Sequence, residues 1–190
     1  IADEDSVSLD DRITRRRPSH HELDIVVVRL PRISNYDDVE ALEHEAGVVV
    51  RFVEQPDEIQ GADLVILPGS KNTVADLMWL RANGIAGKIL ARAHEGKPIL
   101  GICGGCQMLG EVIDDPHGVE STDTQVRGLG LLALRTHFER EKVTAQVLAR
   151  VLRPSFLTDG AVVEEDVRGY EIHMGMVEPK NRQASPFEIR

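Results

Sequence analysis

A short apolar strand that runs directly into a helix through glycines is the feature that most constrains this chain. Residues 97–102 are expected to form the strand and residues 107–112 the first turns of the helix, with Cys103, Gly104 and Gly105 between them. So sharp a turn holds its apex residue in a backbone conformation that side chains resist, and small neighbours make room for it. The sequence therefore predicts a nucleophile elbow in which Cys103 projects from the sheet at a helix N-terminus.

Three interpretations of Cys103 are open at this point. The free N–H groups and the dipole of a helix N-terminus favour a reactive thiolate. A buried, inert thiol is the commonest role of a cysteine, although such a residue does not need the flanking glycines Gly101 and Gly110. Cys103 and Cys106 also have the Cys-x-x-Cys spacing of a redox pair. No metal site is expected, because the chain has no second cysteine pair and no histidine pair with ligand spacing.

The composition limits the other possibilities. A chain of 190 residues is long enough for one domain with a sizeable core. Its formal charge of -10, from 32 acidic and 22 basic side chains, argues against nucleic-acid and anionic-membrane partners. No segment approaches transmembrane length and no signal peptide opens the chain. Two cysteines three positions apart are no disulfide framework, so a reducing cytoplasm is the expected location.

Strands and helices alternate over the first two thirds of the chain. Residues 24–30 are a nearly continuous β-branched run, typical of a strand buried on both faces. Further strands are expected at 47–53, 63–67 and 97–102, and helices at about 36–45, 73–82 and 85–95. A polar loop at 114–128 and strands at 129–134, 142–151 and 166–177 should follow, with a frayed end at 179–190. This pattern predicts an α/β fold: an open, mostly parallel, doubly wound sheet with an antiparallel extension.

Three loops should meet at one edge of this sheet. In such folds the functional site lies beyond the carboxyl ends of the strands. The loops at 31–35 and 69–73 and the Cys103 elbow all fall there. A backbone N–H group at Gly69 or Ser70 could stabilise an oxyanion, although a plain strand-to-helix turn is the alternative. The Gly-Ser-Lys sequence at this loop lacks the glycine spacing of a phosphate loop.

Four stretches carry a resemblance to known enzymes. Residues 101–107 (Gly-Ile-Cys-Gly-Gly-Cys-Gln) resemble the Gly-x-Cys-x-Gly-x-Gln elbow of the triad-type, class I glutamine amidotransferases. Residues 29–35, 67–73 and 169–175 (Arg-Leu-Pro-Arg-Ile-Ser-Asn, Leu-Pro-Gly-Ser-Lys-Asn-Thr and Gly-Tyr-Glu-Ile-His-Met-Gly) are similar to blocks of the cobyric acid synthase family, in the region after its ATP-binding domain. The resemblance spans about 24–178, has its motifs in the right order, and implies a flavodoxin-like fold.

This resemblance implies a function. The family uses ATP and glutamine to amidate carboxylate side chains on the corrin ring of a cobalamin precursor. This domain would hydrolyse L-glutamine and pass ammonia to a synthetase domain, absent here, that binds the corrinoid with ATP and Mg²⁺. No cofactor is expected in the glutaminase domain itself. Residues 1–22 would then be the linker from the synthetase domain, and residues 23–190 an amidotransferase domain cut short at its C-terminus.

The resemblance also implies roles for individual residues. Cys103 would attack the side-chain amide of glutamine and form a glutamyl thioester. The backbone N–H of Gly104 would be one oxyanion donor, and the backbone around Gly69 the second. Gln107 would help to shape the glutamine pocket, and Cys106 would only pack.

Two positions are possible for the catalytic base. A cysteine amidase needs a histidine that shares the thiol proton and then protonates ammonia, and His173 is the candidate. In this family the catalytic histidine belongs to a later His-Gly motif, which is not found before Arg190. Triad relatives have a glutamate two positions after the histidine, where this chain has Gly175, but Glu171 shares the strand face of His173. The base is therefore expected at His173 or beyond residue 190, and in the second case the chain alone would be inactive.

Other functions compete with this interpretation. A related amidotransferase subunit would act on another carboxylate, such as a cell-wall precursor, but the stretch at 29–35 favours the corrinoid enzyme. A non-catalytic docking domain would keep Cys103 and lack a base. A redox protein would depend on Cys106, whereas an amidase would tolerate its replacement by serine.

Overall fold

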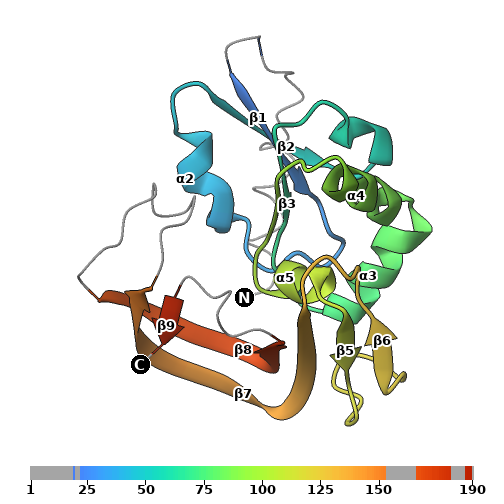
Figure 1. Ribbon diagram of the computed structural model, residues 1–190, viewed down its shortest axis with the longest axis vertical. Coiled ribbons are helices and arrows are strands. Elements are labelled where there is room, and N and C mark those ends of the chain that lie inside the picture. The colour runs from blue at the N-terminus through green and yellow to red at the C-terminus, as the bar shows by residue number, and fades with distance from the viewer. Residues whose placement is uncertain (1–18, 20–21, 153–165, 181–186, 190) are drawn as a thin grey trace, which may run out of the picture.

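The computed structural model describes residue 19 and residues 22–152, 166–180 and 187–189. The linker expected at 1–22 therefore lies almost wholly outside the described residues. The described chain forms an α/β layer with a second, mainly antiparallel sheet beneath it (Figure 1). Among these residues there is no helix with the length and apolar character that crossing a membrane requires.

Four parallel strands form the first sheet, in the order β2-β1-β3-β4. They are β1 (Leu23–Val28), β2 (Val48–Val53), β3 (Leu64–Leu67) and β4 (Ile99–Gly101). Every residue of β1 after the first is buried, as its continuous apolar sequence predicts for a strand covered on both faces. The predicted parallel sheet is confirmed, and its strands begin and end within two residues of the expected positions.

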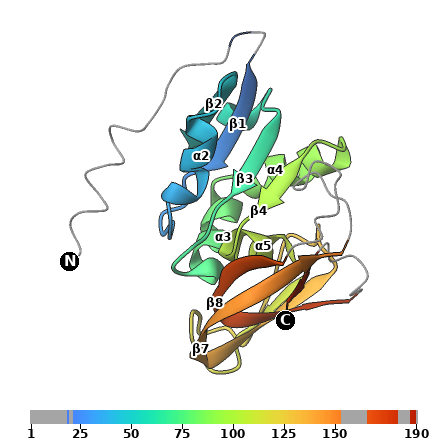
Figure 2. The same cartoon turned by 90° about the vertical axis from the view of Figure 1, so that its left-hand side faces the viewer.

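Helices cover both faces of this sheet (Figures 1 and 2). The helices α3 (Thr73–Ala82) and α4 (Ile85–His94) have the predicted ranges within one residue, and they lie together on one face. On the other face lie a 3-10 turn, η1 (Asp37–Val39), and the one-turn helix α2 (Glu40–Glu43).

The helix predicted over about 36–45 is correct in place but too long. Ser34 or Asn35 could cap such a helix by residue type, yet the observed N-cap residues are Tyr36 for η1 and Val39 for α2, and neither makes a side-chain capping bond. The backbone N–H of Ser34 instead donates to the carbonyl of Gly69 over 3.0 Å, which draws this segment toward the neighbouring loop. Without a cap, and with acidic side chains throughout, only short helical turns form.

The helix after the elbow begins earlier than the sequence indicates. Helix α5 runs over Gly104–Leu109, directly after Cys103, rather than from residue 107 to residue 112. Gly110 is extended, with φ -65° and ψ 178°, and ends the helix. The next strand, β5, follows at Val112–Asp114.

The antiparallel part forms a second sheet of its own instead of extending the first. Its order is β6-β5-β7-β8, and β9 pairs with β7. Strand β5 pairs with β7 in parallel, and the other pairs are antiparallel. These strands are β6 (Gln125–Arg127), β7 (Leu134–Val151), β8 (Val167–Pro179) and β9 (Phe187–Ile189).

Three details of this region differ from the prediction. The strand expected at 129–134 is irregular up to residue 133, because the N–H groups of Leu129 and Leu131 donate to carbonyls at the end of α5. The polar loop at 114–128 contains β6. The end at 179–190, expected to be frayed, contributes β9, although residues 181–186 and 190 lie outside the described residues.

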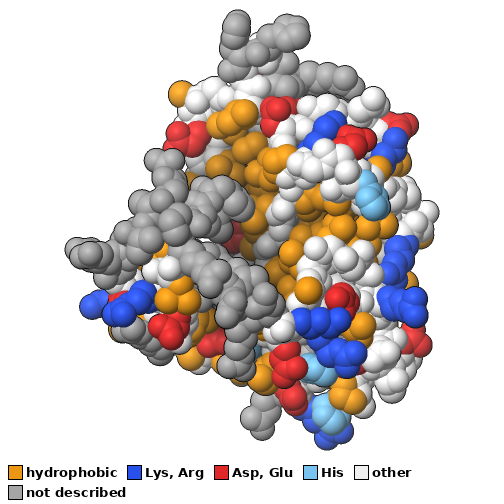
Figure 3. Space-filling model, in the orientation of Figure 1, with side chains coloured by type: hydrophobic (Ala, Val, Ile, Leu, Met, Phe, Trp, Pro, Cys, Tyr) orange, Lys and Arg blue, Asp and Glu red, His pale blue; other side chains and the backbone are white. Residues whose placement is uncertain are grey.

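The second sheet lies across the carboxyl ends of the parallel strands. In Figure 2 the arrowheads of β3 and β4 point down toward β7 and β8. Hydrophobic side chains gather between α2 and the α3–α4 pair, where the edge strand β4 lies (Figure 3). The loop after β3 and the elbow after β4 therefore face the second sheet, which is where the predicted site residues fall.

Candidate active site

The backbone of Cys103 is strained in the way the elbow motif predicts. Its φ is 49° and its ψ is -113°, and no other described non-glycine residue has a positive φ. Such a conformation costs on the order of 1–3 kcal/mol and persists where the surroundings enforce it. Here α5 is packed so closely that a Cβ on Gly105 would overlap the carbonyl oxygen of Leu67. The Cys103 side chain is exposed at the start of α5.

The loop after β3 lies against this elbow. A Cβ built on Gly69 would be 3.7 Å from the Cβ of Cys103 and would overlap Oγ of Ser34. A Cβ on Gly104 would be 3.0 Å from the backbone nitrogen of Ser70. In the described part of the chain, the N–H groups of Gly69 and Gly104 donate to no protein acceptor. Two free backbone donors beside an exposed thiol are the elements of an oxyanion hole.

Gln107 is buried in α5 and connects two neighbouring elements. Its Oε1 accepts a hydrogen bond of 3.1 Å from the hydroxyl of Thr73, the first residue of α3. Its Nε2 would be 2.9 Å from a Cβ on Gly175 of β8. Gln107 therefore sits at the junction of α3, α5 and β8, on the wall of the cleft that the elbow forms.

Cys106 lies one turn behind Cys103 and is partly buried. Burial raises the pKa of its thiol, and the neighbouring Cys103 raises it further. A raised pKa keeps the group as an unreactive thiol near neutral pH. Both cysteines are free.

A cleft of about 720 Å³ opens between the elbow and the second sheet. This volume is within the range of small-molecule sites, about 300–1,000 Å³. Cys103, Cys106 and Gln107 line it from the elbow side, and Glu171 and His173 line it from β8. The fold therefore brings the predicted nucleophile and the predicted base to the same cavity, from positions 70 residues apart in the sequence.

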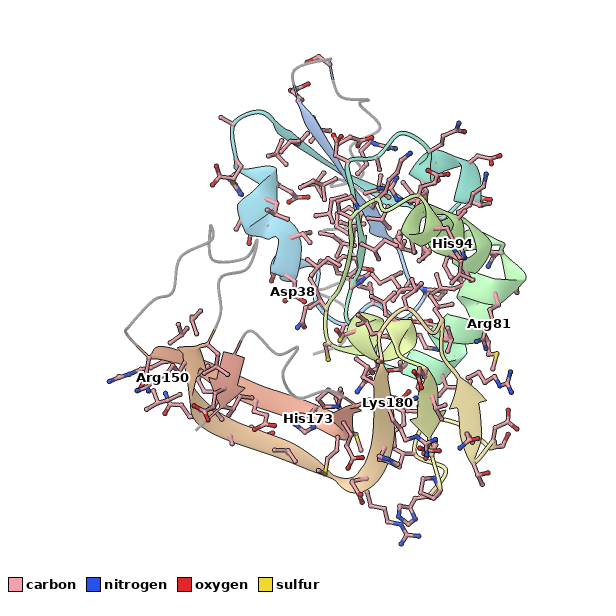
Figure 4. The ribbon with its side chains drawn as sticks, in the orientation of Figure 1. Asp38, Arg81, His94, Arg150, His173 and Lys180 are labelled. Atoms are coloured by element: carbon pink, nitrogen blue, oxygen red, sulfur yellow. The ribbon has the colours of Figure 1, made fainter. Side chains whose placement is uncertain are left out.

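The strand register explains why His173 faces the elbow. Side chains two positions apart project from the same face of a strand, so Glu171, His173 and Gly175 share one face. A Cβ built on Gly175 would lie 2.9 Å from Nε2 of Gln107 on α5, so this face of β8 lies against the elbow helix. Figure 4 shows His173 on β8 beneath α5, whereas His94 lies far from it on α4.

His173 and Glu171 form a close pair. Nε2 of the imidazole lies 2.7 Å from Oε1 of Glu171. Nδ1 of the same ring is buried and has no hydrogen-bond partner among the described residues. A ring that donates Nε2–H to a carboxylate keeps Nδ1 free as a proton acceptor.

Sequence reasoning missed two residues beside this site, Thr73 and Asp76. Both lie in the first turn of α3 and both are buried. Asp76 falls at helical spacing with the apolar Leu80, on the face that packs into the core. A carboxylate on such a face needs a partner, and that pattern could have identified it.

Comparison with known proteins agrees with this geometry. Residues 24–190 match the CobB/CobQ-like glutamine amidotransferase domain. A cobyric acid synthase of Sorangium cellulosum is 59% identical over 198 residues, which cover 100% of this chain and 38% of that protein. One of Dehalococcoides mccartyi is 48% identical over 175 residues, covering 92% of this chain and 34% of that protein. The chain thus spans little more than a third of the length of these relatives.

Solved structures share the fold. A crystal structure of a glutamine amidotransferase superimposes with a TM-score of 0.56 at 20% identity, covering 77% of this chain and 70% of that one. The structure of PurLQS from Thermotoga maritima gives a TM-score of 0.58 at 22% identity, covering 81% of this chain and 68% of that one. These similarities support the α/β architecture.

Proposed function

Because this chain belongs to the CobB/CobQ-like glutamine amidotransferase family, we propose that Cys103 is the nucleophile with which it hydrolyses glutamine. The observation that carries this assignment is the strained backbone of Cys103, exposed on the cleft beside two free N–H groups. The glutaminase unit would comprise residues 23–190, which the family match over residues 24–190 supports.

The chemistry follows from these groups. The sulfur of Cys103 attacks the side-chain amide carbon of glutamine, and the carbonyl oxygen becomes an oxyanion held by the N–H groups of Gly69 and Gly104. The carbon–nitrogen bond then breaks, ammonia leaves with the proton that came from the thiol, and a glutamyl thioester remains. Water attacks this thioester, which releases glutamate and returns the proton to sulfur.

We propose that His173 carries this proton and that Glu171 orients it. The 2.7 Å contact between the two side chains fixes the ring, and the unpartnered Nδ1 supplies the acceptor. In this arrangement Gln107 holds the wall of the pocket through Thr73 and β8 rather than reacting.

The ammonia would serve a second part of a longer protein. The relatives named cobyric acid synthase are more than twice as long as this chain, which supports a separate synthetase part. We propose that this part binds the corrinoid substrate and uses ATP and Mg²⁺ to activate its carboxylates for amidation. In the present chain, the serine of the Gly-Ser-Lys sequence forms an internal hydrogen bond, since the hydroxyl of Ser70 donates to Asp76.

A labelling experiment tests the nucleophile. The protein is treated with a glutamine-mimicking diazoketone, with and without free glutamine, and the modified residue is mapped by mass spectrometry. Labelling confined to Cys103 and blocked by glutamine is expected. A folded protein that stays unlabelled would contradict the proposal, and equal labelling of Cys106 without glutamine protection would favour the redox interpretation.

A second experiment tests the base. Glutamate release is measured for His173→Ala, together with alkylation of Cys103 by iodoacetamide, which needs no glutamine pocket. If His173 is the base, both rates fall. If the alkylation rate is unchanged and only the KM for glutamine rises, His173 binds substrate and the base lies elsewhere.

A further inference from the structure

A buried carboxylate joins the two loops that border the elbow. Asp76, in the first turn of α3, is 0% exposed. It accepts a hydrogen bond of 2.7 Å from the hydroxyl of Ser70 and one of 3.2 Å from the backbone N–H of Arg32. Nη1 of Arg32 donates to its other oxygen over 3.1 Å. One carboxylate therefore binds residues from both the loop after β1 and the loop after β3.

These bonds surround Gly69. On one side, the N–H of Ser34 donates to the carbonyl of Gly69 over 3.0 Å, and that of Lys71 donates to the carbonyl of Arg32 over 2.7 Å. On the other side, Asp76 holds the side chain of Ser70, the next residue after Gly69. Bonds at Gly69 itself and at the two residues after it thus restrain the position of Gly69 beside Cys103.

The same helical turn also contacts the elbow helix. Thr73, three residues before Asp76, donates to Gln107 of α5 over 3.1 Å. The first turn of α3 is therefore the common support of the oxyanion loop and of the helix that carries the nucleophile. A buried charge is costly unless several donors satisfy it, and here three donors and a helix N-terminus do so.

From this arrangement we propose that Asp76 is a positioning residue for the oxyanion hole. By binding Arg32 and Ser70, Asp76 holds the Gly69 N–H where the oxyanion forms. The Thr73–Gln107 bond fixes the position of the elbow helix, and so of Cys103, relative to that N–H. This role rests on the proposed glutaminase function. It also gives the Arg-Leu-Pro-Arg-Ile-Ser-Asn stretch at 29–35 a place in catalysis, as the partner loop of the clamp.

The test compares Asp76→Asn with a matched variant, Asp24→Asn, in the full-length protein that contains this domain. Asp24 is also buried, at 6% exposure, and its carboxylate is paired with Arg51 at 2.7 Å. It lies at the beginning of β1, at the end of the sheet away from the elbow. Both variants should unfold at lower urea concentrations than the wild type, so a loss of stability alone does not separate them.

Catalysis separates them. For Asp76→Asn we expect kcat for glutamine hydrolysis and the rate of diazoketone labelling to fall by roughly 10–100-fold. This fall is no larger than the decrease in kcat that removal of a whole oxyanion donor causes. KM and the rate of iodoacetamide alkylation of Cys103 should stay close to the wild-type values, because neither needs the oxyanion hole. Asp24→Asn should keep the wild-type kcat.

Three results would overturn the proposal. One is an unchanged kcat in a folded Asp76→Asn protein, and another is a parallel loss of kcat and iodoacetamide reactivity. If Asp76→Asn fails to fold, Ser70→Ala replaces it. This change removes the 2.7 Å contact with Asp76 together with the 3.0 Å bond that Oγ of Ser70 accepts from the N–H of Asn72, and it leaves the buried carboxylate in place. An unchanged kcat there would be the third. A wild-type protein that releases no glutamate would contradict the glutaminase function itself, before any comparison of variants.

Discussion

Nε2 of His173 lies 2.7 Å from Oε1 of Glu171, two residues earlier on the same face of β8. This pair faces the elbow because the next position on that face, Gly175, lets β8 approach Gln107. The Cys103 thiol proposed as the nucleophile, an imidazole and a carboxylate thus share one cleft, from segments that lie far apart in the sequence.

We expect this pair to act as a unit. Glu171→Gln should lower kcat by about 10-fold or more, and His173→Ala by about 10²–10⁴-fold, since general acid–base catalysis contributes effects of that size. The double variant should be no slower than His173→Ala, because Glu171 acts only through the imidazole. Steady-state glutamate release measures all three. Multiplicative losses would contradict the triad arrangement.

The close approach of β8 to α5 requires a glycine at position 175. A Cβ there would lie 2.9 Å from Nε2 of Gln107 and 2.9 Å from Cγ2 of Thr136, both in buried side chains. Gly175→Ala should therefore reduce the free energy of unfolding by about 1–3 kcal/mol, the usual cost of overpacking. It should also lower glutamine turnover by moving the wall of the cleft.

Gly169 supplies the control for this substitution. It lies on the same strand, and a Cβ there would meet nothing within 4 Å. Gly169→Ala should leave both stability and turnover near the wild-type values in urea unfolding and glutamate-release assays. If both substitutions reduced stability and turnover equally, the loss would come from a general intolerance of side chains in β8. The close approach of β8 to α5 would then not be the cause.

The two cysteines should differ in their reaction with iodoacetamide. Because burial, and then Cys103, raises the pKa of Cys106, its thiolate should form only at a pH above that of an ordinary thiol. Cys106→Ser should keep glutamine hydrolysis, and Cys103→Ser should abolish it. Mass mapping of alkylation across a pH series measures the midpoint for Cys106. A midpoint at or below the ordinary thiol value would contradict this assignment.

Two carboxylates in the 115–121 loop should change the free energy of unfolding with pH in opposite directions. Burial favours a higher pKa for Asp115, but backbone N–H groups at Val119, Glu120, Ser121 and Gly118 outweigh it and hold the pKa below its usual value. The stability this provides is present at neutral pH and is lost as the pH falls through the folded-state pKa. Asp115→Asn should cost about 1–3 kcal/mol at pH 7 and progressively less in acid.

Glu120 provides the contrasting case. Burial raises its pKa although the N–H of Val74 donates to it, so the folded state gains stability when this carboxyl is protonated in acid. Relative to Glu120→Gln, the wild type should therefore become more stable as the pH falls. Urea unfolding from pH 4 to 8 tests both variants. The same pH slope for Asp115→Asn and Glu120→Gln would contradict the opposite shifts.

Local sequence was sufficient for the parallel sheet, for α3 and α4, and for the elbow. The β-branched run of β1 is buried on both faces wherever it packs, so it specifies a central parallel strand by itself. Gly104 and Gly105 after an apolar strand likewise specify a sharp turn around Cys103, because few other residues fit there. These features depend on neighbours within a few residues, which a single sequence displays.

Tertiary structure decided the features that depend on distant partners. The carbonyls at the end of α5 engage Leu129 and Leu131, so a segment with strand-like composition stays irregular. The second sheet folds across the carboxyl edge of the first and brings His173 and Glu171 to the cleft that Cys103 lines, although nothing near residue 103 specifies that arrangement.

The chain by itself therefore determined which residues could react, through the backbone that its glycines and apolar runs impose around Cys103. Only the folded structure decided which groups lie near it: the imidazole of His173 in the same cleft, and the Asp76 carboxylate that binds Ser70 in the loop after β3. The physical reason is that backbone conformation is set by short-range sterics, whereas the pairing of buried polar groups depends on desolvation, which exists only once the distant segments have packed together.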